Sequence, residues 1–105
     1  MSESNGAGAA VSDEEVVEGI RLLAESEGLF AETAGGVTIA GLRRLVQREQ
    51  VGKDEVVVAF ITGAGLKTQE AVADALPAPL MVQPTVESFE AALLERHGGK
   101  SPVSV

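Results

Sequence analysis

The residues best suited to chemistry stand in one short run, Thr62-Gly63-Ala64-Gly65-Leu66-Lys67-Thr68. It follows an apolar segment that reads as a strand, and ligands bind beyond the carboxyl ends of strands in open α/β sheets. The two glycines would let the backbone approach a ligand, and a helix starting after them would offer amide groups to an anion. A ligand-contacting loop and an ordinary strand-to-helix turn are equally good interpretations of these residues.

Two well-known phosphate-binding patterns do not fit this run. A P-loop requires glycine directly before its lysine, but Leu66 separates Gly65 from Lys67. The dinucleotide pattern requires a third glycine where this chain has Thr68. Neither of these nucleotide-binding loops is therefore predicted.

A second candidate loop is Glu32-Thr33-Ala34-Gly35-Gly36, at the entrance of an expected helix. Its small residues permit close packing or close approach of a ligand, and its acid is a candidate for a buried functional group. Because glutamate is rarely buried, the residues alone favour an exposed Glu32 beside a flexible glycine pair.

The other polar groups predict no site. His97 is the only histidine, and we expect it to be exposed at the end of the last helix, where the helix dipole favours its positive charge. With no second histidine and no cysteine, no metal site is expected. The acidic run from Asp13 to Glu18 is best interpreted as the solvated start of a helix.

Composition narrows the function classes. The 105 residues are enough for one small domain, and an apolar fraction of 45% predicts a packed core. The net charge of −8 argues against nucleic acid and anionic membrane surfaces as partners. No stretch resembles a secretory signal or a membrane span, so we expect a cytoplasmic protein.

The hydrophobic pattern predicts three main helices. Ser12 and Glu15 form a capping box that opens a helix over residues 13–27, with Gly28 as its stop. A second helix is expected after Gly36, and a last one after Thr85. A short helix capped by Thr68 is predicted to run through residue 75.

Residues 55–62 form the best strand candidate, because they are β-branched and almost continuously apolar. Residues 80–82 are a weak second candidate. A strand covered on both faces needs hydrogen-bonded neighbours, and this chain offers one convincing strand. We therefore predict an α/β fold in which helices flank part of a parallel sheet, completed by a partner or by a longer polypeptide.

The two loops together carry a resemblance to a known family. Residues 29–38, Leu-Phe-Ala-Glu-Thr-Ala-Gly-Gly-Val-Thr, resemble a segment of the threonine synthases. Residues 58–68, Val-Ala-Phe-Ile-Thr-Gly-Ala-Gly-Leu-Lys-Thr, resemble a later segment of the same enzymes, in the same order and at a matching separation. The likeness is strong from residue 11 to residue 72, weaker to residue 91, and absent at both ends.

This resemblance implies a carboxy-terminal piece of a fold-type-II enzyme that uses pyridoxal 5′-phosphate (PLP). The family converts O-phosphohomoserine and water into threonine and phosphate. By resemblance, the Thr62 hydroxyl faces the pyridine nitrogen, Glu32 lies close to the cofactor, and Gly63 and Gly65 let the backbone approach the ring. Lys67 is a candidate for contacting the substrate phosphate.

The resemblance also implies what these residues lack. The family's Schiff-base lysine and its cofactor-phosphate loop lie in earlier segments, and nothing in these 105 residues matches either one. No catalytic residue is therefore predicted, and PLP binding and activity by this chain alone are not expected. An acidic, non-catalytic binding or dimerisation module and a defunct gene fragment are the alternatives.

The expected organisation has four parts. Residues 1–11 and 98–105 are predicted to be flexible tails, and residues 12–76 to belong to the PLP-enzyme catalytic domain. Residues 77–97 form a carboxy-terminal extension with the last helix. The expected partner is the missing amino-terminal part of the enzyme or a second copy of the chain, with a small-molecule substrate only in the completed enzyme.

Overall fold

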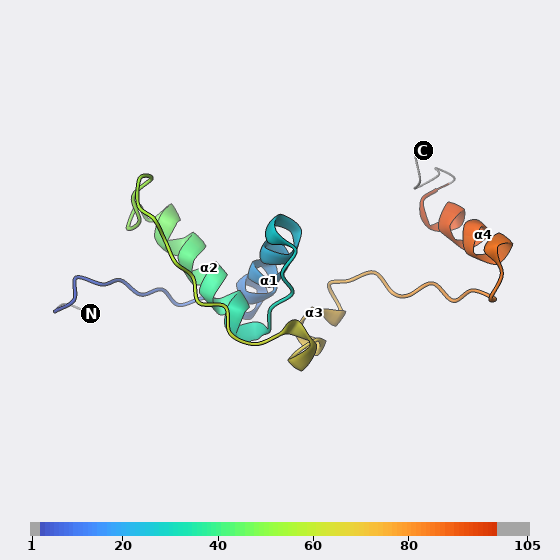
Figure 1. The fold of residues 1–105 in the computed structure, drawn as a ribbon, viewed down its shortest axis with the longest axis horizontal. Helices are drawn as coiled ribbons and strands as arrows, with labels where there is room; N and C mark the ends of the chain where they lie inside the picture. Colours follow the sequence, from blue (N-terminus) through green and yellow to red (C-terminus); the bar gives the residue numbers. More distant parts are fainter. Residues whose placement is uncertain (1–2, 99–105) are drawn as a thin grey trace.

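The computed structural model describes residues 3–98, which form an elongated chain of helices joined by extended segments (Figure 1). No strand longer than an isolated bridge occurs in this range. Its helices are α1 (Asp13–Glu27), α2 (Thr33–Gln47), the 3-10 helix η1 (Gly65–Lys67), α3 (Glu70–Ala73) and α4 (Val86–Arg96).

Both ends of α1 follow from the sequence. The Ser12 hydroxyl accepts a hydrogen bond from the Glu15 amide at 3.2 Å, and the Glu15 carboxylate accepts one from the Ser12 amide at 2.7 Å. This reciprocal pair satisfies two amides that have no partner within the helix. At the other end Gly28 adopts a left-handed conformation with φ of 69°, and its amide donates to the Ala24 carbonyl. The predicted helix over residues 13–27 is confirmed.

Glycines bring α1 and α2 into direct contact. A Cβ added to Gly36 would lie 2.6 Å from the Val16 carbonyl oxygen and 2.7 Å from Ile20 Cγ1, and Gly19 is equally crowded by Gly36 and Ala40. The helices diverge from this contact in a V, as Figure 1 shows. Glycine is needed here because a larger side chain would push the two backbones apart. The interpretation of Gly35-Gly36 as a flexible pair is therefore wrong, since both lie buried in the first turn of α2.

Ion pairs join the two helices beside this contact. The guanidinium of Arg44 donates to one Glu15 carboxylate oxygen from two nitrogens, at 2.7 and 3.1 Å, and also to the Ala10 carbonyl at 2.7 Å. About a third of each side chain of this pair is exposed. Arg43 pairs with Glu18 at 3.4 Å, nearer the solvent. The Arg44 contacts hold the segment before α1 against α2.

The core beneath these helices is small. Its buried apolar side chains come from α1, from the loop before α2, from α2 and from α3: Val16, Ile20, Leu23, Ala31, Ala40 and Val72. Ile20, which is only 2% exposed, and Val72 belong to one cluster, so α3 closes one end of the helix pair. Every buried residue lies before Ala73, which places the folded body within the first three quarters of the described chain.

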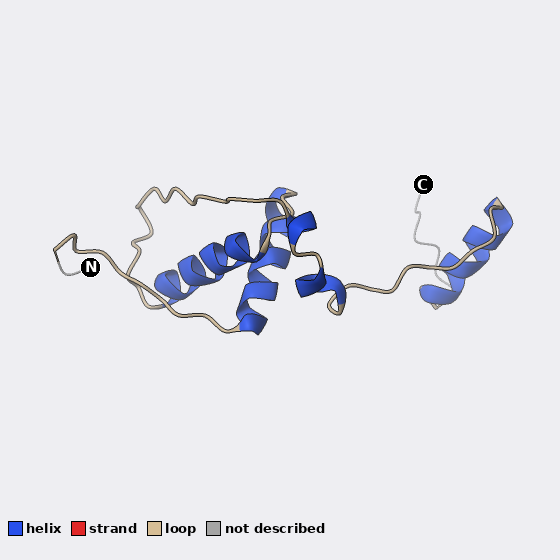
Figure 2. Cartoon of the chain, turned by 90° about the horizontal axis from the view of Figure 1, so that it is seen from below, coloured by secondary structure: helices blue, strands red, loops and turns tan. Residues whose placement is uncertain are grey.

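Residues 55–62 differ most from the prediction. They are extended, as expected, but no backbone group from 56 to 62 forms a hydrogen bond within the described range. Val56 is 93% exposed and Phe60 81% exposed, so most of the apolar side chains expected inside a sheet face solvent, while Ile61 is half-buried. No neighbouring strand is available in residues 3–98, and the parallel sheet itself stays a prediction. Figure 2 shows this segment as a loop returning past α2.

The carboxy-terminal part is an arm that leads away from the body (Figures 1 and 2). Residues 77–85 are an extended linker, and Thr85 caps α4 by accepting a hydrogen bond from the Ser88 amide at 3.2 Å. The expected opening of the last helix is confirmed. Residues 80–82 form no strand, because they pair with no other segment. Residues 99–105 of the expected tail lie outside the described range.

The contact between α1 and α2 predicts opposite effects for two matched substitutions. Gly36→Ala should destabilise the chain by roughly 1–3 kcal/mol, because the added methyl overlaps Val16 and Ile20. Gly41→Ala, in the same helix, meets no atom within 4 Å and should stabilise the chain by up to about 1 kcal/mol through helix propensity. Urea unfolding followed by circular dichroism measures both, and equal effects of the two substitutions would contradict this packing.

The Glu15 carboxylate, which is bonded to the Ser12 backbone and paired with Arg44, predicts an acid-sensitive helix contact. The hydrogen bond from the Ser12 backbone lowers the pKa of the Glu15 carboxyl below its usual 4.5, desolvation opposes this, and Arg44 lowers the pKa further. A lowered pKa in the folded state means that the stabilisation is fully present above about pH 4.5 and disappears as the pH falls through the lowered value.

The urea midpoint of the wild-type chain should therefore fall between pH 5.5 and pH 3, while Glu15→Gln should have a lower midpoint at pH 5.5 and a flatter dependence. Glu90→Gln is the control, since the Glu90 side chain makes no hydrogen bond or ion pair in the described chain. If Glu15→Gln retained the full wild-type dependence, the Glu15 carboxylate would not be its origin.

Candidate functional site

The two loops singled out in the sequence meet in the folded chain. Ala31 and Ala64 form an antiparallel bridge. On either side of it, the Gly65 amide donates to the Phe30 carbonyl at 2.9 Å and the Glu32 amide donates to the Gly63 carbonyl at 3.3 Å. We call this set of contacts between residues 30–33 and 63–68 the cross-loop ladder.

Glycines in the second loop make this close approach possible. Gly63 has a φ of 84°, a conformation that side chains rarely tolerate, and a Cβ there would collide with the Glu32 carboxylate. A Cβ on Gly65, which is buried, would overlap the Phe30 ring. Gly63 is therefore favoured by its backbone conformation and Gly65 by its contact with the Phe30 ring, both within this chain. Their predicted role toward a cofactor ring stays a prediction.

The polar residues of the two loops have different surroundings. Thr62 is exposed, and its hydroxyl makes no hydrogen bond within the described residues. Glu32 is half-buried, and its carboxylate forms no ion pair in this range. Lys67 is exposed on η1. The ladder thus places the Glu32 carboxylate beside Gly63, the residue that follows Thr62, and Lys67 lies on the same loop as Thr62.

Thr68 has a role that the sequence did not indicate. It was expected to cap the following helix, but Gln69 holds that position at the start of α3. The Thr68 hydroxyl instead accepts a hydrogen bond from the Thr33 amide at 3.1 Å, across 35 residues. The prediction was wrong because a cap between distant segments leaves no local pattern. The same holds for Phe30, whose contact with Gly65 depends on the fold.

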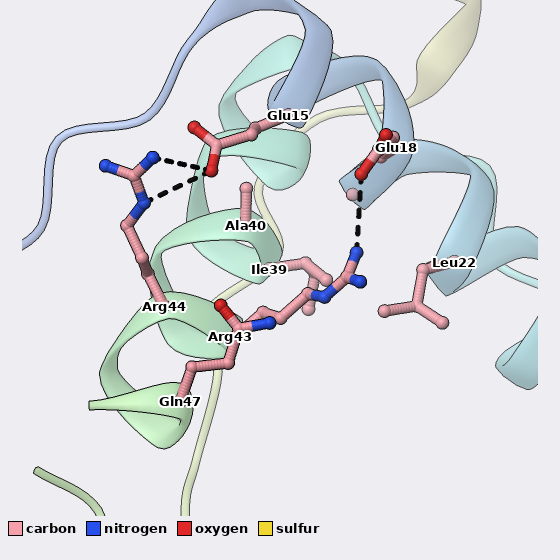
Figure 3. Close-up of a pocket in the computed structure, with 9 residues that line it drawn as sticks. Glu15, Glu18, Leu22, Ile39, Ala40, Arg43, Arg44 and Gln47 are labelled. Carbon is pink, nitrogen blue, oxygen red and sulfur yellow. Dashed lines mark hydrogen bonds and ion pairs between the residues drawn. The ribbon is translucent and has the colours of Figure 1, made fainter. Parts of the chain in front are cut away.

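A separate pocket of about 140 Å³ lies between α1 and α2 (Figure 3). Its polar lining consists mainly of the two ion pairs, Glu15 with Arg44 and Glu18 with Arg43. Because these charges already neutralise one another, the pocket offers little to a charged ligand. None of its lining residues belongs to the cross-loop ladder.

Other kinds of site receive no support from the described chain. His97 is exposed at the carboxyl end of α4, as expected. Residues 3–98 contain no cluster of three acidic or histidine side chains arranged to hold a metal ion. No helix in this range is long and apolar enough to cross a membrane.

Comparison with known proteins supports the resemblance carried by the two loops. The threonine synthase of Methanocaldococcus jannaschii is 41% identical over 80 residues, which cover 76% of this chain and 20% of that protein. The threonine synthase of Methanosarcina acetivorans is 36% identical over 93 residues, covering 89% and 23%. That of Halalkalibacterium halodurans is 46% identical over 66 residues, covering 63% and 19%.

The chain therefore spans about a fifth of the length of these curated relatives. The family model described as "Pyridoxal-phosphate dependent enzyme" matches residues 1–63, which include the first loop, the extended segment and the start of the second loop. With more than half of its residues matched, this chain belongs to the family of pyridoxal-phosphate dependent enzymes.

Proposed function

We propose that this chain forms one part of a threonine synthase, with the remainder supplied by another polypeptide or by a longer chain. The completed enzyme would convert O-phosphohomoserine and water into threonine and phosphate in the cytoplasm. Similarity to threonine synthases over most of the chain supports this assignment. The single observation that carries it is the uncovered extended segment that leads into the cross-loop ladder.

This segment has the form of a strand without its sheet. Its backbone groups from 56 to 62 are unpaired within the described chain, and Val56, Val58 and Phe60 are largely exposed. A continuous apolar run is typical of a strand covered on both faces in a parallel sheet. Burying these side chains and pairing their backbone would stabilise the strand, so we infer that it joins a parallel sheet of the completed fold-type-II enzyme.

The residues at the end of this segment carry polar groups of the kind that one edge of PLP requires. An exposed Thr62 hydroxyl can hydrogen-bond the pyridine nitrogen, and the Glu32 carboxylate lies beside Gly63, the residue that follows Thr62. The cofactor, when bound, serves as the electron sink for elimination and replacement at the substrate. The described residues include no match to the family's cofactor lysine or phosphate loop, so those groups must come from elsewhere in the enzyme.

In the completed enzyme, Thr62 and Lys67 would each have one role. With the cofactor bound, a neutral hydroxyl from Thr62 would orient the ring without holding its nitrogen protonated, which would limit how strongly the ring withdraws electrons. Lys67, exposed on η1, would supply a positive charge for the substrate phosphate. Covering the strand would also exclude water from this edge of the site, which strengthens the hydrogen bonds there.

The first prediction compares the chain with a chimera. The 105-residue chain alone should form no imine with PLP and release no phosphate from O-phosphohomoserine. A chimera of the Methanocaldococcus jannaschii threonine synthase, in which this chain replaces the 80 matched residues, should do both. Imine formation is measured by absorbance and phosphate release by a coupled assay.

An inactive but folded chimera would count against the proposed function. So would a specific lysine of the isolated chain becoming attached to PLP after borohydride reduction. Dimers of the isolated chain that are abolished by Val58→Lys would favour the alternative of a non-catalytic dimerisation module.

The second prediction concerns Thr62 in the active chimera. Thr62→Val should lower turnover about tenfold, as expected for one lost hydrogen bond, and leave the fold intact. Thr38→Val is the matched control, because it removes a threonine hydroxyl that bonds only to the Ala34 carbonyl within α2. Unchanged turnover in Thr62→Val would remove the role assigned to this hydroxyl.

A further inference from the structure

Helix α2 lacks a cap of its own. The N-cap residue Glu32 makes no capping hydrogen bond with its side chain, although the first amides of a helix have no partners within it. The Thr33 amide instead donates to the Thr68 hydroxyl at 3.1 Å. The first turn of α2 is thus capped from the other candidate loop.

The same threonine is tied into its own loop through its backbone. The Thr68 amide donates to the Gly65 carbonyl at 3.0 Å, and the Ala71 amide donates to the Thr68 carbonyl at 3.1 Å. These bonds fix Thr68 between η1 and α3. Its hydroxyl therefore links a segment that is already held by backbone hydrogen bonds to the start of α2.

This link is the third bond of the cross-loop ladder. The other two join Gly65 to Phe30 and Glu32 to Gly63, and all three connect segments more than 30 residues apart. Thr62 directly precedes Gly63 on one side of the ladder, while Glu32 lies on the other. The ladder therefore sets the distance and orientation between the two residues proposed to face the cofactor.

We propose that Thr68 is a positioning residue whose hydroxyl holds Glu32 and Thr62 in register by capping α2 across the ladder. Its effect on the reaction rests on the proposed function. Its effect on the ladder depends only on contacts within this chain. The competing explanation is a cap that stabilises α2 without affecting the register of the loops.

The first test uses the full chain without cofactor. Thr68→Val preserves the branched shape and removes the hydroxyl, whereas Thr68→Ser keeps the hydroxyl. Amide hydrogen exchange by NMR should become faster at Thr33, Glu32 and Gly65 in Thr68→Val and stay near wild type in Thr68→Ser. Faster exchange at Thr33 alone would overturn the proposal in favour of a simple cap.

Thr85→Val provides the matched control. The Thr85 hydroxyl caps α4 locally by accepting from the Ser88 amide, outside the ladder. Its loss should speed exchange at Ser88 and leave Glu32 and Gly65 unchanged. If Thr85→Val also loosened the ladder, the response to Thr68→Val would reflect general destabilisation and the proposal would fail.

The second test measures the reaction in the active chimera. Thr68→Val should lower kcat about tenfold or more and shift the cofactor absorbance band, because small displacements of positioned groups slow chemistry strongly. Thr68→Ser should restore both, and Thr85→Val should change neither. If Thr68→Val kept the wild-type kcat and absorbance band, the positioning role would be overturned. If the chimera were inactive with Thr68 in place, the proposed function would be overturned instead. The exchange experiment would then decide about Thr68.

Discussion

The cross-loop ladder is the contact on which the arrangement of the candidate site depends. It joins the start of α2 to the loop after the extended segment, where Gly63 adopts a φ of 84° and Gly65 leaves room for the Phe30 ring. The side chains of Glu32 and Phe30 fill the space that the glycines leave. Hydrogen bonds between groups that are in contact with water add little net stability. The packing of Glu32 against Gly63 and of Phe30 against Gly65 must therefore do much to fix how the two loops pair.

Local features of the fold were predictable from the sequence. The capping box of Ser12 and Glu15, the stop at Gly28 and the cap at Thr85 each depend on residues within a few positions. The physical signal for such features is complete in a short stretch of chain. The extended backbone of residues 55–62 was predictable for the same reason, because β-branched residues restrict it locally.

Features that depend on distant segments were not predictable in this way. The residues favoured a flexible Gly35-Gly36 pair, but the α1 surface that packs against Gly36 turns it into a required contact. The sequence predicted that Thr68 caps the short helix that follows it, but in the structure its hydroxyl caps the start of α2. The proximity of the two loops was implied by family resemblance, whereas its cause, the bonds and glycines of the ladder, became visible only in the fold. The tasks assigned to Thr62, Glu32 and Lys67 still rest on that resemblance.

Some contacts of the candidate site are complete within this chain, whereas the extended segment needs a partner. The helix contact at Gly36 and the ladder are satisfied internally, and they place Glu32 next to the end of the extended segment. The segment itself has neither hydrogen-bonded neighbours nor cover for Val56 and Phe60 in the described chain. A partner that supplied neighbouring strands would therefore have to order only this segment. The loop geometry beyond it would already be in place, which lowers the entropic cost of assembling the site.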